Sequence, residues 1–197
     1  QGRMHQDIAH FPSQYFYDGL LDVATARQKI PSRQPRLQFI NVQPPASSPS
    51  DRVNMAEAKV AAHVVVQTWL HYGTDFNADS TVGVIVPYRS QISVVRQAIA
   101  TAVAALPVEQ ATSVSRLVLS NITIDTVERF QGSQRDTIVY CFTIQQRHQL
   151  SFLTSSVFEE DGQVIDRKLN VAMTRARERL VMTGHAALLQ ENLTFAR

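Results

Sequence analysis

The sequence has little cysteine and glycine, few lysines, and no long hydrophobic run. Cys141 is the single cysteine among 197 residues, which excludes an intramolecular disulfide and a zinc site built from several cysteines. That scarcity is typical of an intracellular location, cytoplasmic or nucleoid-associated. No apolar run approaches the roughly 18 residues that a membrane-spanning helix needs, so no membrane partner is expected. The first residue is not methionine, which favours a fragment of a longer chain.

Several catalytic signatures are also missing. No glycine is followed by lysine, so the chain lacks the G-x-x-x-x-G-K-[S/T] loop that cradles nucleotide phosphates. No apolar segment ends in the Asp-Glu pair that commonly binds magnesium in such enzymes. The chain contains neither a G-x-S-x-G nucleophile turn nor an H-E-x-x-H zinc motif. These absences argue against a self-contained nucleotide hydrolase, a serine hydrolase of that type and a zinc protease.

The positive charge that is present comes mainly from arginine. The formal net charge is only +2, which does not by itself indicate nucleic-acid binding. The 19 basic residues include only three lysines. Arginine presents a planar fork of donors that suits phosphate recognition. A composition bias of the source genome explains the arginine content equally well.

Hydrophobic periodicity predicts an α/β fold with a mostly parallel sheet. Hydrophobic residues make up 44% of the chain, enough for a buried core. Short β-branched runs predict strands at 37–42, 82–86, 122–126, 137–143 and 180–183. Helical spacing predicts helices at 54–72, from the second strand to Pro107, and at 169–178, the first capped by Asn54 with Glu57. Strands this apolar, alternating with helices, are buried on both faces. We therefore expect one α/β domain over 36–197, with a less regular lead-in over 1–35.

Ligand positions follow from this fold class. Open parallel sheets bind ligands beside the carboxyl ends of their strands. The residues directly after the predicted strands, many of them polar or basic, are Pro87-Tyr88-Arg89, 127–132 and Gly184-His185.

Three sequence strings carry a more specific signal. They are V-I-V-P-Y-R-S-Q at 84–91, I-D-T-V-E-R-F-Q-G-S-Q-R-D at 124–136, and R-K-L-N-V-A-M-T-R-A-R at 167–177. In this order they closely resemble motifs IV, V and VI of superfamily 1 helicases. The similar branch includes nuclease-helicases and the RNA helicase of nonsense-mediated decay. Q-G-R-M-H at 1–5 resembles that branch's Q-Y-R-M-H-P segment, so the resemblance covers nearly the whole chain.

The resemblance implies the second of two RecA-like domains, a P-loop-NTPase-type fold that lacks its own phosphate loop. ATP and Mg²⁺ would be bound mainly by the N-terminal RecA-like domain of the same parent chain. The parent would be an ATP-dependent helicase acting on single-stranded DNA or RNA, and the 197-residue fragment alone would be inactive. A catalytically silent, helicase-derived module for nucleic-acid binding or scaffolding remains the alternative.

The resemblance also implies catalytic and ATP-binding residues. Arg175 matches the family arginine that reaches the γ-phosphate as an arginine finger, and Arg3 matches an arginine with a similar task. Helical phasing over 169–178 predicts that Arg175 points away from a core-packed face. Without the resemblance, a solvated surface arginine is the simpler interpretation. ATP-binding roles fall on Gly132, Gln134 and Arg177.

The sequence departs from the family at two positions. Gln134 replaces a glutamate that commonly contacts the ribose, and Gly2 replaces a tyrosine that lies near the adenine in many relatives. The implied nucleic-acid contacts are Pro87, Tyr88, Arg89, Thr126, Arg129 and Gln131. Segment 145–166 matches the family poorly. It is either a loop that orders against the first domain or nucleic acid, or a segment packed on the surface.

Overall fold

Five strands form one parallel sheet in a computed structural model of the chain. The structure describes residues 8, 35–45, 48–107, 121–130, 133–154, 157–160, 163–192 and 195, with backbone alone for 157–160 and 163–167. The strand order is β1-β7-β4-β2-β3, and every neighbouring pair runs parallel. The strands are β1 Leu37–Asn41, β2 Val82–Ile85, β3 Thr123–Asp125, β4 Arg135–Cys141 and β7 Ala176–Gly184. The predicted α/β class with a parallel sheet is confirmed.

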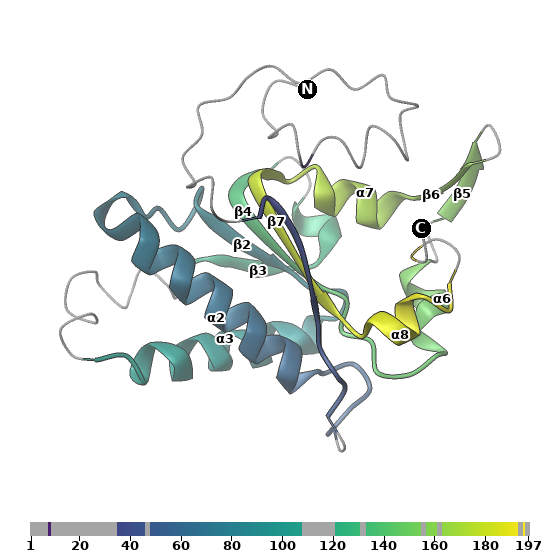
Figure 1. The fold of residues 1–197 in the computed structure, drawn as a ribbon, viewed down its shortest axis with the longest axis horizontal. Helices are drawn as coiled ribbons and strands as arrows, with labels where there is room; N and C mark the ends of the chain where they lie inside the picture. Colours follow the sequence, from purple (N-terminus) through teal and green to yellow (C-terminus); the bar gives the residue numbers. More distant parts are fainter. Residues whose placement is uncertain are drawn as a thin grey trace.

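Helices cover both faces of the sheet (Figure 1). The long helices α2 Met55–Tyr72 and α3 Arg89–Ala104 pack side by side on one face. The other face carries η2 Val127–Phe130, α6 Gln149–Leu153, α7 Arg167–Met173 and α8 Ala186–Leu189. The short 3-10 helix η1 Gly73–Asp75 follows α2, and β5 Val157–Glu160 pairs with β6 Gln163–Asp166 as a hairpin. No helix in the described part of the chain is long and apolar enough to cross a membrane.

The two faces receive alternate residues of the same strands. Val84, Val139 and Val181 pack with α2 and α3 in one core cluster. Their neighbours Ile85 and Ile138 lie in the second cluster, on the opposite face. Successive side chains of a strand point to opposite faces, so a sheet covered on both sides requires strands that are apolar throughout. This explains why uninterrupted apolar runs predicted the strands.

The predicted cap of the first long helix is present. The Asn54 side-chain oxygen accepts the N–H groups of Ala56 and Glu57, both at 3.0 Å. Gln91, in the first turn of α3, accepts the Asn54 N–H at 2.9 Å and donates to the Asn54 carbonyl at 2.8 Å. The start of α3 therefore fixes the start of α2, since one buried amide satisfies both backbone groups of the cap residue.

The predicted helix over 169–178 is wrong in its second half. Helix α7 ends at Met173, and β7 already begins at Ala176. From Ala176 to Leu180 the residues alternate between buried and half-buried, the two-residue period of a strand. Strand β4 supplies the pairing, because the Arg135 N–H donates to the Arg175 carbonyl at 2.9 Å. Apolar residues at 176 and 180 fit the period of a helix as well as that of a strand. Pairing with the neighbouring strand β4 selects the strand.

All five strands run in the same direction, so the sheet has two distinct ends. We call them the amino edge, where β4 and β7 begin at Arg135 and Ala176, and the carboxyl edge, where strands end. The 167–177 string reaches the amino edge, whereas the 84–91 string reaches the carboxyl edge. The 124–136 string leaves β3 at the carboxyl edge and enters β4 at the amino edge.

Candidate functional site

Arg175 lies at the amino edge, in the turn between α7 and β7. Its Nε donates to the Val171 carbonyl at 3.1 Å, and its Nη2 donates to the Thr174 hydroxyl at 3.1 Å. A cation beside the last carbonyls of a helix is electrostatically favourable. The guanidinium is thus positioned by the end of α7, and not by the outward face of a longer helix as the periodicity predicted.

Arg177, two residues later, is held by a buried carboxylate. Its Nη1 lies 3.5 Å from Asp136 Oδ1, and the Asp136 side chain is almost fully buried. Asp136 also accepts the Tyr72 hydroxyl at 3.4 Å. Burial, together with the carboxylates of Asp136 and Glu178, raises the pKa of Tyr72 above its ordinary value, so Tyr72 remains a hydrogen-bond donor. The expected ATP-binding residue Arg177 is therefore ion-paired, with its side chain 34% exposed.

Gln134 joins the second and third sequence strings. Its Nε2 donates to the Thr174 carbonyl at 3.3 Å, in the same turn that carries Arg175. Its Oε1 is buried and accepts no hydrogen bond from the described residues. A buried amide oxygen without a donor is uncommon, because its desolvation is not compensated. The structure therefore brings Gln134 and Arg175 together, with one acceptor still unsatisfied.

Further arginines, which sequence reasoning missed, gather at the same edge. Five arginines lie close to the amino ends of the strands: Arg36, Arg135, Arg175, Arg177 and Arg179. Arg36 pairs with Glu178 at 3.5 Å, both buried, and Arg179 donates to the Gln38 side chain at 2.9 Å. The R-E-R alternation at 177–179 is the signal that could have found Arg179, but the helix predicted over 169–178 obscured its two-residue period. Guanidiniums match phosphate groups well, and Arg175, Arg177 and Arg179 are the members of the group that remain partly exposed.

Arg135 is a structural member of this group. It donates to the Gln134 carbonyl at 3.0 Å and to the Thr123 hydroxyl at 2.8 Å, and its guanidinium lies 5.8 Å from the centre of the Phe130 ring. Burial is the main cause that lowers its pKa, with Arg177 adding to the effect. Phe130 itself is fully buried and packs against Gly83, where a Cβ would come within 2.9 Å of the ring. These contacts fix Phe130 and Arg135 against the sheet.

At the carboxyl edge, the first string is held by an aromatic and an amide contact. Pro87 and Tyr88 are half-buried, and Arg89 is exposed at the start of α3. The Tyr88 ring stacks on Phe152 of α6 with centroids 5.0 Å apart. Its hydroxyl lies 3.4 Å from Gln149 Nε2, which donates to it. The 84–91 string, which resembles motif IV, thus contacts the 145–166 segment, which resembles the helicase family poorly.

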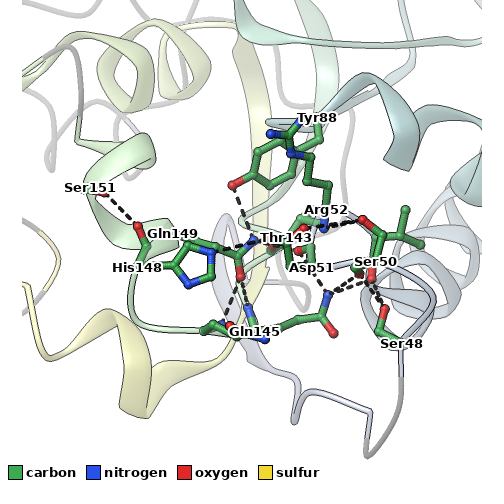
Figure 2. Close-up of polar contacts among 12 residues, drawn as sticks. Ser48, Ser50, Asp51, Arg52, Tyr88, Thr143, Gln145, His148, Gln149 and Ser151 are labelled. Carbon is green, nitrogen blue, oxygen red and sulfur yellow. Dashed lines mark hydrogen bonds and ion pairs between the residues drawn. The ribbon is translucent and has the colours of Figure 1, made fainter.

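Two glutamines connect three loops at this edge (Figure 2). Gln149 donates to the Asp51 carbonyl at 2.6 Å and accepts the N–H groups of Gln145 and Gln146 at 2.8 and 3.0 Å. Gln145 in turn donates to the Val53 carbonyl at 2.7 Å. For residues 145–154, packing within the chain is therefore the correct one of the two alternatives. No motif indicated these amides, because their partners are backbone groups about 90 residues away in sequence.

A buried carboxyl group braces the same edge. Glu57 accepts the Thr143 N–H at 3.1 Å, the Thr183 hydroxyl at 3.0 Å and the Asn54 side-chain amide at 3.1 Å. Burial raises its pKa from 4.5 to about 8, although these hydrogen bonds oppose the shift. Thr143 has a φ of 52°, an uncommon conformation for a residue with a side chain. Glu57 thus holds the chain where it leaves β4 and ties that point to α2 and β7.

The remaining expected contacts lie around η2 or outside the described residues. Thr126 is half-buried, with its N–H donated to Asp125 Oδ1 at 2.8 Å. Arg129 is exposed, and its guanidinium lies 3.7 Å from Asp125 Oδ2. Glu128 pairs with Lys168 of α7 at 3.6 Å. The expected site residues Arg3, Gln131 and Gly132 lie outside the described residues.

The expected site residues therefore divide into two groups. Gln134, Arg175 and Arg177 share the amino edge, whereas Pro87, Tyr88 and Arg89 share the carboxyl edge. Within the described part of the chain, no group of three or more His, Cys, Asp or Glu side chains could hold a metal ion. The sheet thus presents an arginine-rich end and an amide-rich end, and neither supplies a carboxylate cluster for a cation.

Comparisons with known proteins identify the family of the chain. A family model described as an AAA domain (AAA_12) matches residues 1–187. Helicase sen1 of Schizosaccharomyces pombe is 31% identical over 96% of this chain and 11% of its own length. Regulator of nonsense transcripts 1 of Dictyostelium discoideum is 26% identical over 98% of the chain and 14% of its own length. DNA polymerase alpha-associated DNA helicase A of Saccharomyces cerevisiae is 27% identical over 96% of the chain and 27% of its own length.

The chain therefore spans between 11% and 27% of the length of these three relatives. The match of the family model covers nearly the whole chain, and the parallel sheet is the one that such a domain requires. The chain belongs to the AAA_12 family and is a C-terminal RecA-like domain of the superfamily 1 helicases that include sen1 and the regulators of nonsense transcripts.

Proposed function

We propose that this chain is the second RecA-like domain of an ATP-dependent helicase that moves along single-stranded DNA or RNA. The observation that carries the proposal is the contact at one turn of the amino edge. There Gln134 of the motif V string donates to Thr174 of the motif VI string, directly beside Arg175. Two strings 40 residues apart thus bring an amide and a guanidinium to the same residue, Thr174.

The nucleotide fits this edge on two grounds. The arginines supply positive charge where the phosphates of ATP would lie, and Arg175 would act as the arginine finger that stabilises charge during phosphoryl transfer. The unsatisfied Gln134 Oε1 would accept a hydrogen bond from a ribose hydroxyl, which an amide can do as well as a carboxylate. Gly132 would let the backbone approach the nucleotide, and Arg177 and Arg3 would add phosphate contacts.

Magnesium would be held elsewhere. The described residues offer no carboxylate cluster for it, so the metal ligands would come from the N-terminal RecA-like domain of the same parent chain. Bound there, Mg²⁺ neutralises the phosphate oxygens during hydrolysis. This chain alone would then be inactive as an ATPase, because it supplies only one side of the cleft.

The single strand would lie at the opposite, carboxyl edge. Pro87 and Tyr88 follow β2 there, Arg89 begins α3, and Thr126 follows β3. Contacts from these residues, and from Arg129 and Gln131, would reach the sugar-phosphate backbone and would therefore be sequence-independent and salt-sensitive. Thr126 follows β3 at the carboxyl edge and Gln134 precedes β4 at the amino edge, so closure on ATP at one edge would shift the strand at the other.

The test is ATP hydrolysis by the full-length parent, with and without single-stranded DNA or RNA. We expect strand-stimulated turnover that falls about 10³-fold in Arg175→Ala, the range for loss of an arginine finger. Arg96→Ala, at an exposed position of α3, is the matched control and should hydrolyse ATP like the parent. Turnover that survives Arg175→Ala would refute the finger assignment while keeping the enzyme.

The second candidate is a catalytically silent module that only binds nucleic acid or partners. It is favoured by the glutamine at 134 and by the ion pair that engages Arg177. The two candidates differ in the parent sequence upstream of residue 1. A phosphate loop and an Asp-Glu pair there favour the enzyme, whereas their absence, with no turnover on any strand, establishes the module.

A further inference from the structure

Phe152 is exposed at the point where the three motif strings meet. Its side chain is 42% exposed, although it stacks on Tyr88 of the first string at 5.0 Å and an interplanar angle of 21°. Lys168, of the third string, places its ammonium 4.8 Å from the centre of the same ring. That ammonium also lies 3.6 Å from Glu128 of the second string.

The exposure of Phe152 is not a consequence of loose packing. On the same short helix, Leu150 and Leu153 are buried in the second core cluster, and Gln149 is anchored to Asp51, Thr143 and Tyr88. Helix α6 is therefore held on its inner side, with one large aromatic ring directed outward. A ring fixed in this way is ordered before any ligand arrives, which reduces the entropy that binding costs.

We propose that Phe152 is a stacking platform for an unpaired nucleobase and that Lys168 binds the adjacent phosphate. The proposal rests on the proposed function, because it places the ligand on the same carboxyl edge as the single strand. Bases stack on aromatic side chains irrespective of sequence, since every base has a π-face. The ligand class is therefore single-stranded nucleic acid without a base preference.

Lys168 can change partners on binding. The Lys168 side chain keeps 25% of its surface exposed, and stacking of a base on a ring is at least comparable in strength to the contact between an ammonium and that ring. Its ion pair with Glu128 is long at 3.6 Å, and Glu128 itself is largely exposed. A base would thus displace the ammonium from the ring, and the flexible lysine stem would carry the charge to the phosphate beside that base.

The experiment compares a natural single strand with an abasic strand of the same length. Fluorescence anisotropy would measure binding of the full-length parent to labelled oligonucleotides of about ten nucleotides, one of thymidines and one of abasic sites. The parent should prefer the thymidine strand. In Phe152→Leu we expect affinity for that strand to fall about tenfold, with abasic binding unchanged. Phe152→Trp should keep the preference.

The matched control is Phe39→Leu. Phe39 lies on the edge strand β1 and is 40% exposed, so it tests whether loss of any exposed ring weakens binding. Lys168→Gln should weaken binding to both oligonucleotides. The slope of the logarithm of affinity against the logarithm of salt concentration should fall by about the contribution of one phosphate contact. An unchanged preference in Phe152→Leu would overturn the platform and leave the proposed function intact. Failure of the parent to bind either strand would overturn both.

Discussion

The two edges of the sheet hold their polar groups in different ways. At the amino edge the anchors are charged: Arg36 pairs with Glu178, and Arg177 pairs with Asp136. At the carboxyl edge the network is built on neutral glutamines that bond to backbone groups. Figure 1 shows that different helices lie at the two edges. Helix α7 approaches the start of β7, whereas α6 and α8 lie towards its end.

The difference fits two kinds of ligand. A cluster of guanidiniums carries a positive charge that matches closely spaced phosphates. At the carboxyl edge, glutamine amides instead hold backbone groups and aromatic rings in place, and bases stack on such rings irrespective of sequence. In the proposed function, the guanidiniums of the amino edge therefore suit the nucleotide, and the aromatic rings and cations of the carboxyl edge suit the single strand.

The largest effects should come from one substitution at each edge, with ATP turnover and strand affinity measured for both variants. In the full-length parent, Arg175→Ala should lower strand-stimulated ATP turnover about 10³-fold and leave ATP-free strand affinity within about twofold. Phe152→Leu should do the reverse, weakening strand affinity more than turnover at saturating strand. Steady-state hydrolysis and anisotropy on the same preparations measure both. Equal losses of both activities in either variant would show that the two edges are not separate sites.

Removing the carboxyl brace should destabilise the fold itself. Glu57→Ala leaves the buried Thr143 N–H and Thr183 hydroxyl without their acceptor, and we expect the free energy of unfolding to fall by about 3 kcal/mol. Urea denaturation measures the loss. Glu191→Ala, which removes an exposed ion pair with Arg147, is the control and should cost no more than about 0.5 kcal/mol. Equal losses in the two variants would contradict the bracing role.

The same carboxyl group should make stability depend on pH. Burial raises the folded-state pKa of Glu57 to about 8, whereas the unfolded chain keeps the ordinary value near 4.5. Between these values the folded chain binds more protons, so this contribution is full below about pH 4.5 and is lost as pH rises through about 8. The glutamine in Glu57→Gln stays neutral at every pH. In this variant the urea midpoint should therefore fall less between pH 5 and pH 9 than it does in the parent. A decline as steep as in the parent would assign the pH dependence to other groups.

The smallest effect should come from loosening the amide network. Gln149→Leu removes the donor to Asp51 and Tyr88 but retains side-chain volume near α6. We expect strand affinity to fall about threefold, since the stacked pair loses part of its support and not its rings. Anisotropy with the thymidine strand measures this change. Gln67→Leu, exposed on α2, should bind like the parent, and a similar loss there would indicate a non-specific effect.

Local patterns were sufficient for most of the elements. Apolar β-branched runs predicted the five strands because both faces of a parallel sheet are buried, and Asn54 with Glu57 predicted the cap of α2. The error over 174–178 shows the limit of such patterns. Whether these residues continue a helix or begin a strand depends on hydrogen-bond partners in β4, which lie some 40 residues away in sequence.

The sequence by itself determined the α/β class, the order of the three motif strings and the helicase family, because periodicity and short strings are local properties. Only the tertiary structure decided that Gln134 meets Thr174, beside Arg175, at one edge while Tyr88 meets Phe152 at the other. It also decided that a carboxyl group expected only to cap a helix would be buried between α2, β4 and β7. The physical reason is that such contacts join residues 40 to 126 positions apart, and only the register of parallel strands brings them together.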